Sequence, residues 1–155
     1  AAASAQMQPG MAGRYILALA RARVAAGAPL PSDRRDLAWD AWKRNDMREA
    51  SNQLQAHLRT EPDDLDALRL MANVAARQQG KSAERSWLER ALAQTPRISR
   101  DRVDLLERLN RKTEALALVE ELRAQSPADK NLAIIQSRLL IATGNPGRAQ
   151  QVVQP

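Results

Sequence analysis

Three prolines, Pro62, Pro96 and Pro127, divide much of the sequence into segments of similar length. Between the first two, apolar residues recur every three or four positions, which is the spacing of one helix face. These residues are Leu68, Met71, Ala72 and Ala75, followed after Gly80 by Leu88, Ala91 and Leu92. The glycine permits a turn, and the closing proline cannot donate a hydrogen bond to a continuing helix. Each segment of about 34 residues therefore predicts two antiparallel helices, and their recurrence predicts a stack of such pairs.

The same periodicity predicts helices along most of the chain. They cover 11–26, 33–44, 48–60, the two halves of 65–96, 100–109, 113–125, 130–143 and a last segment from 146. We divide the chain into a flexible start (1–10), an N-terminal helix with its linker (11–31) and an array of about three and a half repeats (32–155). The repeats are 32–62, 63–96, 97–127 and 128–155. The residues predicted to form one apolar side of the first helix are Tyr15, Ile16, Leu19, Ala20 and Val24.

The composition favours helices and excludes several kinds of site. Phe is absent and Tyr occurs once, so the core must come from aliphatic side chains, and alanine-rich cores suit helix packing better than β-sheets. We therefore predict an all-α protein. No apolar run approaches the roughly 20 residues of a membrane helix, and without cysteine there is no disulfide or thiolate metal site. We expect a soluble protein, either cytoplasmic or periplasmic, with no membrane insertion.

The net charge of +6 raises the question of a nucleic-acid partner. The basic residues, mostly arginine, are interspersed with Asp and Glu in nearly every predicted helix, and the sequence has no run of five like charges. Aromatic residues make up only 3% of the chain, too few for a surface on which bases stack. This pattern is typical of solvated helix faces. We predict no nucleic-acid partner.

Several positions in the repeats match a known pattern of paired helices. Small residues stand where two helices would touch: Ala38, Ala50, Ala72, Ala91, Ala115 and Ala149. Bulky partners stand beside them: Leu37, Leu54, Met71, Leu88, Leu106, Val119 and Leu140. In this pattern the chain resembles the tetratricopeptide repeat family over 33–155, although Asn45 and Asn110 replace a turn glycine, His57 an alanine and Gln136 a leucine. The resemblance implies a right-handed superhelix of antiparallel helix pairs that binds proteins or peptides.

The segment 63–96 has a narrower similarity. Its sequence, DDLDALRLMANVAARQQGKSAERSWLERALAQTP, resembles the N-terminal repeat arrays of bacterial tetratricopeptide–sulfotransferase fusions, and comparable arrays occur in periplasmic exopolysaccharide-secretion proteins. These similarities imply two alternatives: a substrate-recognition arm whose catalytic domain is absent here, or a scaffold in an envelope assembly. The fourth repeat stops before its second helix is complete, so we expect the C-terminal end to continue or to dock on a partner.

The sequence offers no residues for catalysis or cofactor binding. His57 is the only histidine, and neither a cysteine nor a convergent carboxylate pair accompanies it. We therefore expect a packed, hydrogen-bonded histidine rather than a metal ligand or a general base. The glycine-rich motifs that hold phosphate groups are also missing. We predict no enzyme activity, no cofactor and no metal.

By the resemblance, the first helix of each repeat lines a concave, net-basic groove that binds the partner. The predicted site residues are Arg35, Trp39, Lys43, Arg69, Asn73, Arg77, Arg108 and Arg138. Arg69 and Asn73 resemble the start of a clamp for a peptide carboxylate, but Asp101 and Ile135 do not complete it. Trp39 and Trp42 are either binding residues or packing residues under the helix 11–26, and we favour packing. The predicted function is a non-catalytic scaffold for a protein or peptide that is acidic or ends in a free carboxylate.

Overall fold

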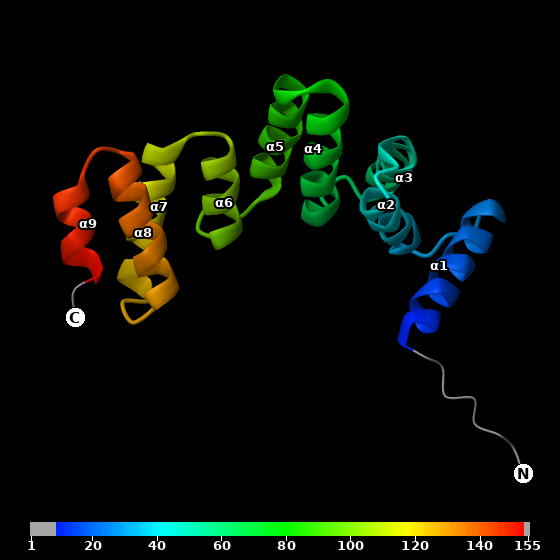
Figure 1. Ribbon diagram of the computed structural model, residues 1–155, viewed down its shortest axis with the longest axis horizontal. Coiled ribbons are helices and arrows are strands. Elements are labelled where there is room, and N and C mark those ends of the chain that lie inside the picture. The colour runs from blue at the N-terminus through cyan, green and yellow to red at the C-terminus, as the bar shows by residue number, and fades with distance from the viewer. Residues whose placement is uncertain (1–8, 154–155) are drawn as a thin grey trace, which may run out of the picture. The chain divides into compact units, whose positions relative to one another are not determined.

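A computed structural model describes residues 9–153, and all regular secondary structure in this range is helical (Figure 1). The helices are α1 (Pro9–Ala25), α2 (Asp33–Lys43), α3 (Met47–Thr60), α4 (Leu65–Gln79), α5 (Lys81–Gln94), α6 (Arg100–Arg108), α7 (Lys112–Gln125), α8 (Lys130–Ala142) and α9 (Pro146–Val153). No strand occurs in this part of the chain. The prediction of an all-α protein is confirmed.

The predicted helix bounds agree with the structure to within one or two residues at most ends. The largest difference lies at the start, because α1 begins at Pro9 and not at residue 11. Pro9 and Gly10 therefore do not belong to a flexible segment, and the rest of that predicted segment lies outside the described residues. A proline is well suited to this position, since the first N–H groups of a helix have no partner within the helix.

The chain divides into two compact units, Ala1–Trp87 and Leu88–Pro155, and the boundary falls within α5. In unit 1, α2 packs against α1 and α3, and α4 packs against α3 and contacts α2. In unit 2, α7 packs against α6 and α8, and α8 packs against α9. Sequential helices are therefore neighbours within each unit, as short connections between antiparallel helices require.

Three helix pairs share the same turn. The second residue after the first helix has a positive φ of 60° to 83°, and it is Asn45, Asn110 or Gly144. Asparagine tolerates this left-handed conformation better than most residues, so it can stand where the family pattern has glycine. In each turn the next N–H donates to the carbonyl of a buried residue in the preceding helix: Ala41, Leu106 and Leu140. These bonds satisfy carbonyl groups that the helix end leaves open.

The cores contain the residues that the periodicity selects. In unit 1 the buried residues include Leu37, Ala38, Ala41, Ala50, Leu54, Leu68, Met71, Ala72 and Ala75. In unit 2 they include Leu88, Ala91, Leu92, Leu106, Ala115, Val119, Leu140 and Ala149. Alanine recurs because small side chains let two helix backbones approach closely. The predicted helix faces in the repeats are confirmed.

The apolar side predicted for α1 is not buried as a whole. Ala20 is buried, but Tyr15 and Ile16 are 60% and 54% exposed, and Leu19 is also exposed. Ala20 and the neighbouring Arg23 share a side of the helix, and Arg23 binds Asp33 at the start of α2 with a bidentate pair of hydrogen bonds of 2.8 and 2.6 Å. The contact of α1 with α2 is therefore anchored by a small residue beside a charge, while Tyr15, Ile16 and Leu19 remain largely exposed.

Candidate functional site

Three of the arginines predicted to bind a partner, Arg35, Arg77 and Arg138, form bridges between successive first helices. In unit 1, Arg35 of α2 donates from Nη1 to Oδ2 of Asp64 at 3.1 Å. Asp64 is the N-cap of α4, and its Oδ1 accepts from the backbone N–H of Ala67. One carboxylate therefore caps α4 and also joins it to α2, which holds the guanidinium of Arg35 in a fixed direction.

A second bridge between the same helices involves Arg77. Its guanidinium carbon lies 4.1 Å from the centroid of the Trp42 ring, in cation–π geometry. Nη1 of the same side chain donates to Oδ1 of Asn45 at 3.0 Å. The sequence analysis favoured packing of Trp42 under the helix 11–26, but its ring lies against Arg77 of α4. The only sign of this contact in the sequence is that Arg77 follows Trp42 by about one repeat.

Unit 2 repeats both arrangements. Arg100 of α6 binds Asp129, which caps α8, and the two residues are 29 positions apart, as Arg35 and Asp64 are. Arg138 of α8 donates from Nη2 to both carboxylate oxygens of Glu107 in α6, at 2.9 and 2.7 Å. We call these arginine bridges between successive first helices the arginine ladder. Its members are Arg35 and Arg77 in unit 1, and Arg100 and Arg138 in unit 2.

The remaining predicted site residues are divided between the same two units. Arg69 and Asn73 are half-buried on α4, and Arg108 is half-buried on α6. Lys43 is exposed at the end of α2. The predicted residues thus lie on first helices of both units. Their arrangement along a single groove stays a prediction.

Trp39 and Lys43 line a shallow cavity of about 310 Å³ at the side of α2 that meets α1. Its other lining residues are Gly13, Ile16, Leu17, Asp36 and Asp40. Trp39 is therefore next to α1, as its predicted packing role requires, but 41% of its surface remains exposed. The two tryptophans thus have different neighbours: Trp39 stands beside α1, and Trp42 stands under Arg77 of α4.

His57 is buried and hydrogen-bonded, as predicted. Its Nε2 lies 2.7 Å from Oδ2 of Asp64, the oxygen that also accepts from Arg35. A carboxylate only accepts, so Nε2 carries the proton. Burial acts to raise the pKa of Asp64, but the Ala67 N–H, His57 and Arg35 together lower it. The cluster therefore holds an ionised carboxylate at the joint between α3 and α4, which is a structural arrangement without a reactive group.

A second ionised carboxylate joins α1 to α2. The hydrogen bond from Arg23 lowers the pKa of Asp33, against the opposing effect of burial, and the N–H of Leu30 contributes to the shift. Asp33 is almost completely buried. Asp33 accepts hydrogen bonds from Arg23 of α1 and from Leu30 of the linker, so this charge fixes α1 relative to α2.

Within residues 9–153 no group of three or more His, Asp or Glu side chains could hold a metal ion. The helices in this range are also too short or too polar for any of them to cross a membrane. No family model matches the chain, and no curated protein is significantly similar to it. What the arrangement offers chemically is a set of oriented guanidinium groups and a shallow cavity beside α1, and both features are suited to binding.

Proposed function

We propose that the protein is a non-catalytic scaffold of the tetratricopeptide type, a right-handed superhelix of antiparallel helix pairs that binds an acidic segment of a partner protein. The first helices would form the binding surface, as the family pattern implies. The proposal draws on the shared turns, the alternation of small and bulky buried residues, and the arrangement of basic side chains along the first helices.

The arginine ladder is the observation that carries the proposal. A guanidinium has five N–H donors in a rigid fork, and each bridge uses only one or two of them. The side chains of Arg100 and Arg138 are still 56% and 61% exposed. Each bridge therefore fixes the direction of an arginine while leaving donors at the surface. Side chains that are already ordered lose less entropy on binding, which favours recognition of carboxylates.

The test measures binding of short synthetic peptides that differ only in having Glu or Lys at alternate positions, by fluorescence anisotropy. The Glu peptide should bind more tightly, and its affinity should fall as salt rises, because charges are screened over about 10 Å at 0.1 M. The double variant Arg100→Gln with Arg138→Gln should bind the Glu peptide about tenfold more weakly.

A matched control changes two exposed arginines of a second helix, Arg48→Gln with Arg59→Gln in α3. It removes the same charge from the chain, so it separates the ladder from the effect of net charge. Thermal melting of every variant checks that the fold is retained. Equal loss of affinity in the two double variants, or binding that ignores salt, would rule out the ladder as the binding surface.

A further inference from the structure

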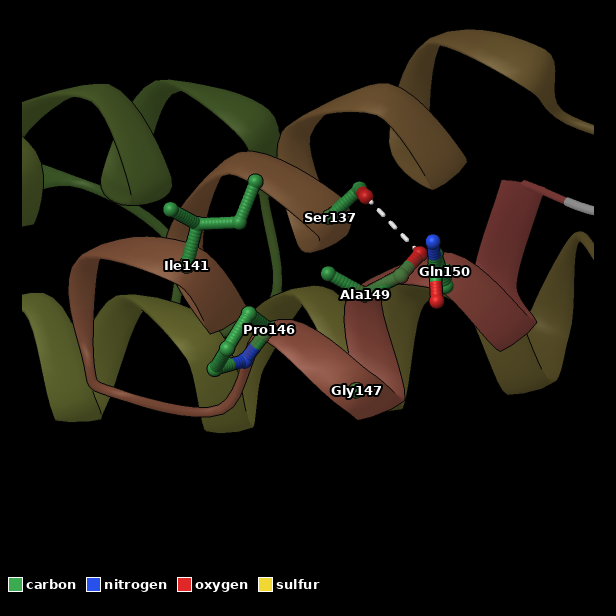
Figure 2. Close-up of a pocket in the computed structure, with 6 residues that line it drawn as sticks. All are labelled: Ser137, Ile141, Pro146, Gly147, Ala149 and Gln150. Atoms are coloured by element: carbon green, nitrogen blue, oxygen red, sulfur yellow. Dashed lines mark hydrogen bonds between the residues drawn. The ribbon is translucent and has the colours of Figure 1, made fainter.

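The outer side of the last helix pair contains a shallow groove of about 530 Å³ (Figure 2). Its lining residues are Ser137 and Ile141 of α8 and Pro146, Gly147, Ala149 and Gln150 of α9. The Ser137 hydroxyl donates to the carbonyl oxygen of Ala149 at 3.0 Å, as the dashed line shows. This bond leaves that hydroxyl proton occupied, so the groove presents mainly small and apolar groups between α8 and α9.

Backbone hydrogen bonds show which earlier residues are equivalent to this groove. In each of the three matching turns, the positive-φ residue donates its N–H to a carbonyl near the end of the first helix. The donors are Asn45, Asn110 and Gly144, and their acceptors are Trp42, Glu107 and Ile141, in the same order. Ile141 therefore occupies the position that Trp42 has in α2 and Glu107 has in α6.

In the two earlier pairs, an arginine of the following first helix covers this position. Arg77 of α4 lies over Trp42, and Arg138 of α8 bonds to Glu107. Trp42 and Glu107 are half-buried, whereas Ile141 is 61% exposed. An isoleucine cannot bind a guanidinium as a tryptophan face or a carboxylate does. The side chain that fits against Ile141 is therefore apolar.

The second helix of each pair gives the same result. The equivalent alanines are Ala50, Ala115 and Ala149, which each donate to the residue just after the turn. All three are buried. The next residue is buried in the earlier pairs, at 7% exposure for Ser51 and 9% for Leu116, but Gln150 is exposed. Following helices pack on the earlier pairs, α4 on α3 and α8 on α7. The α8–α9 groove is thus the same kind of surface, and no other helix within residues 9–153 packs on it.

The charges on this pair restrict what can cover it. The sequence from residue 130 to 153 contains Lys130, Arg138 and Arg148 and no acidic residue. Arg138 and Arg148 are exposed, although they bond to Glu107 and Glu120. A second copy that used the same face would bring these cations close to one another. A second copy that used α1 would add further arginines, because α1 contains no acidic residue. Acidic residues at the edges of an apolar helix would complement them.

We propose that the groove between α8 and α9 binds one amphipathic α-helix of a partner protein, with an apolar face bordered by acidic residues. This inference goes beyond the proposed function. The groove is lined by residues of α8 and α9 and binds a helix, whereas the arginine ladder binds an extended acidic segment. Either site can therefore exist without the other. The occupant resembles α4 in shape, since α4 covers the equivalent surface of α2 and α3.

The experiment uses two helix-stapled peptides with the sequence of α4, Leu65–Gln79. In the acidic peptide Arg69, Asn73 and Arg77 are replaced by Glu, and in the basic peptide Asp66 and Asn73 are replaced by Lys. Binding of each labelled peptide to the full chain is measured by fluorescence anisotropy. The acidic peptide should bind at least tenfold more tightly than the basic one.

The decisive variant is Ile141→Glu, and its matched control is Ile134→Glu. Both isoleucines are on α8 and are exposed to a similar extent, 61% and 58%, but only Ile141 lines the groove. Ile141→Glu should weaken binding of the acidic peptide at least tenfold, while Ile134→Glu should leave it within about twofold. Because both positions are exposed, circular dichroism and melting should be unchanged, and loss of fold would show there.

Three outcomes would overturn the inference: no difference between the two peptides, equal effects of the two substitutions, or no measurable binding of the acidic peptide. Light scattering provides a fourth. If the chain alone forms a dimer that Ile141→Glu dissociates, a second copy and not a partner helix covers the groove. The arginine-ladder double variant, Arg100→Gln with Arg138→Gln, is measured against the extended Glu peptide, so failure of the ladder and failure of the groove are seen separately.

Discussion

Replacing Asp64 by Ala should destabilise unit 1 more than the equivalent change, Asp129→Ala, destabilises unit 2. Both aspartates cap a first helix and bind an arginine of the previous first helix. Only Asp64 also accepts a hydrogen bond from a buried histidine, His57, because Leu122 stands in the matching place of α7. The two substitutions therefore differ by the bond to His57, and Asp129 accepts from one more backbone N–H, that of Asn131.

The expected size follows from the contacts that each substitution removes. Loss of an N-cap costs about 1 kcal/mol. An arginine bridge that is a third or more exposed, as those of Arg35 and Arg100 are, contributes about 0–1 kcal/mol. Leaving the donor of His57 buried without a partner costs about 1–3 kcal/mol more. We expect Asp64→Ala to cost about 2–5 kcal/mol and Asp129→Ala to cost about 1–2 kcal/mol.

Urea unfolding measures both effects. All three tryptophans, at positions 39, 42 and 87, belong to unit 1, so tryptophan fluorescence reports on that unit, while circular dichroism follows both. Asp64→Asn is the rescue variant, because its amide oxygen can still accept from Ala67 while its NH2 group can donate to Nε2 of the other neutral tautomer of His57. It should recover most of the lost free energy of unfolding. If Asp64→Ala and Asp129→Ala lower stability equally, the bond to His57 contributes nothing and the reasoning is refuted.

Three further predictions concern packing, charge and the backbone. Ala72 is completely buried, so Ala72→Leu should overpack unit 1 and lower the free energy of unfolding by about 1–3 kcal/mol, which urea titration measures. The folded-state pKa of Asp33 is below its unfolded value because of Arg23. The stabilisation by Asp33 is therefore present above about pH 4 and is lost as pH falls through the folded pKa. Asp33→Asn should flatten the acid side of a plot of melting temperature against pH. Gly144 has a φ of 83° and Gly147 lies in α9, so Gly144→Ala should destabilise by about 1 kcal/mol and Gly147→Ala should stabilise by about 0.5–1 kcal/mol in thermal melts.

Each of these has a clear contrary result. Unchanged stability of Ala72→Leu would mean that α4 moves to accept a larger side chain. An acid profile that Asp33→Asn leaves unaltered would place the acid sensitivity in other carboxylates, Asp64 first among them. Equal signs for the two glycine substitutions would mean that the turn after α8 adopts another conformation in solution.

The helices and their buried faces could be predicted because the information is local. A helix buries the residues that recur every three or four positions, so Leu37, Leu54, Met71 and their equivalents were correctly placed. The turns were also predictable, since glycine or asparagine tolerates the positive φ at Gly144, Asn45 and Asn110. The number of residues between the closing prolines then predicts how many helix pairs the chain can form.

The partners of the charged residues could not be predicted in this way. The sequence analysis placed Arg35, Arg77 and Arg138 on a binding surface, but it gave no sign that each already binds a residue of a neighbouring first helix. Such pairs are about one repeat apart in the chain, and many arginines and carboxylates occur at compatible spacings. Only the approach of two helices selects which pair forms.

The sequence by itself therefore determined the class of fold, the helices and which face of each repeat helix is buried. The tertiary structure decided which side of α1 meets α2, because an alanine-rich helix has apolar residues on more than one side and the Arg23–Asp33 pair selects among them. It also decided that Trp42 stacks with Arg77 while Trp39 remains partly exposed. Periodicity depends on each helix alone, whereas these choices depend on the distance between helices, which no single helix encodes.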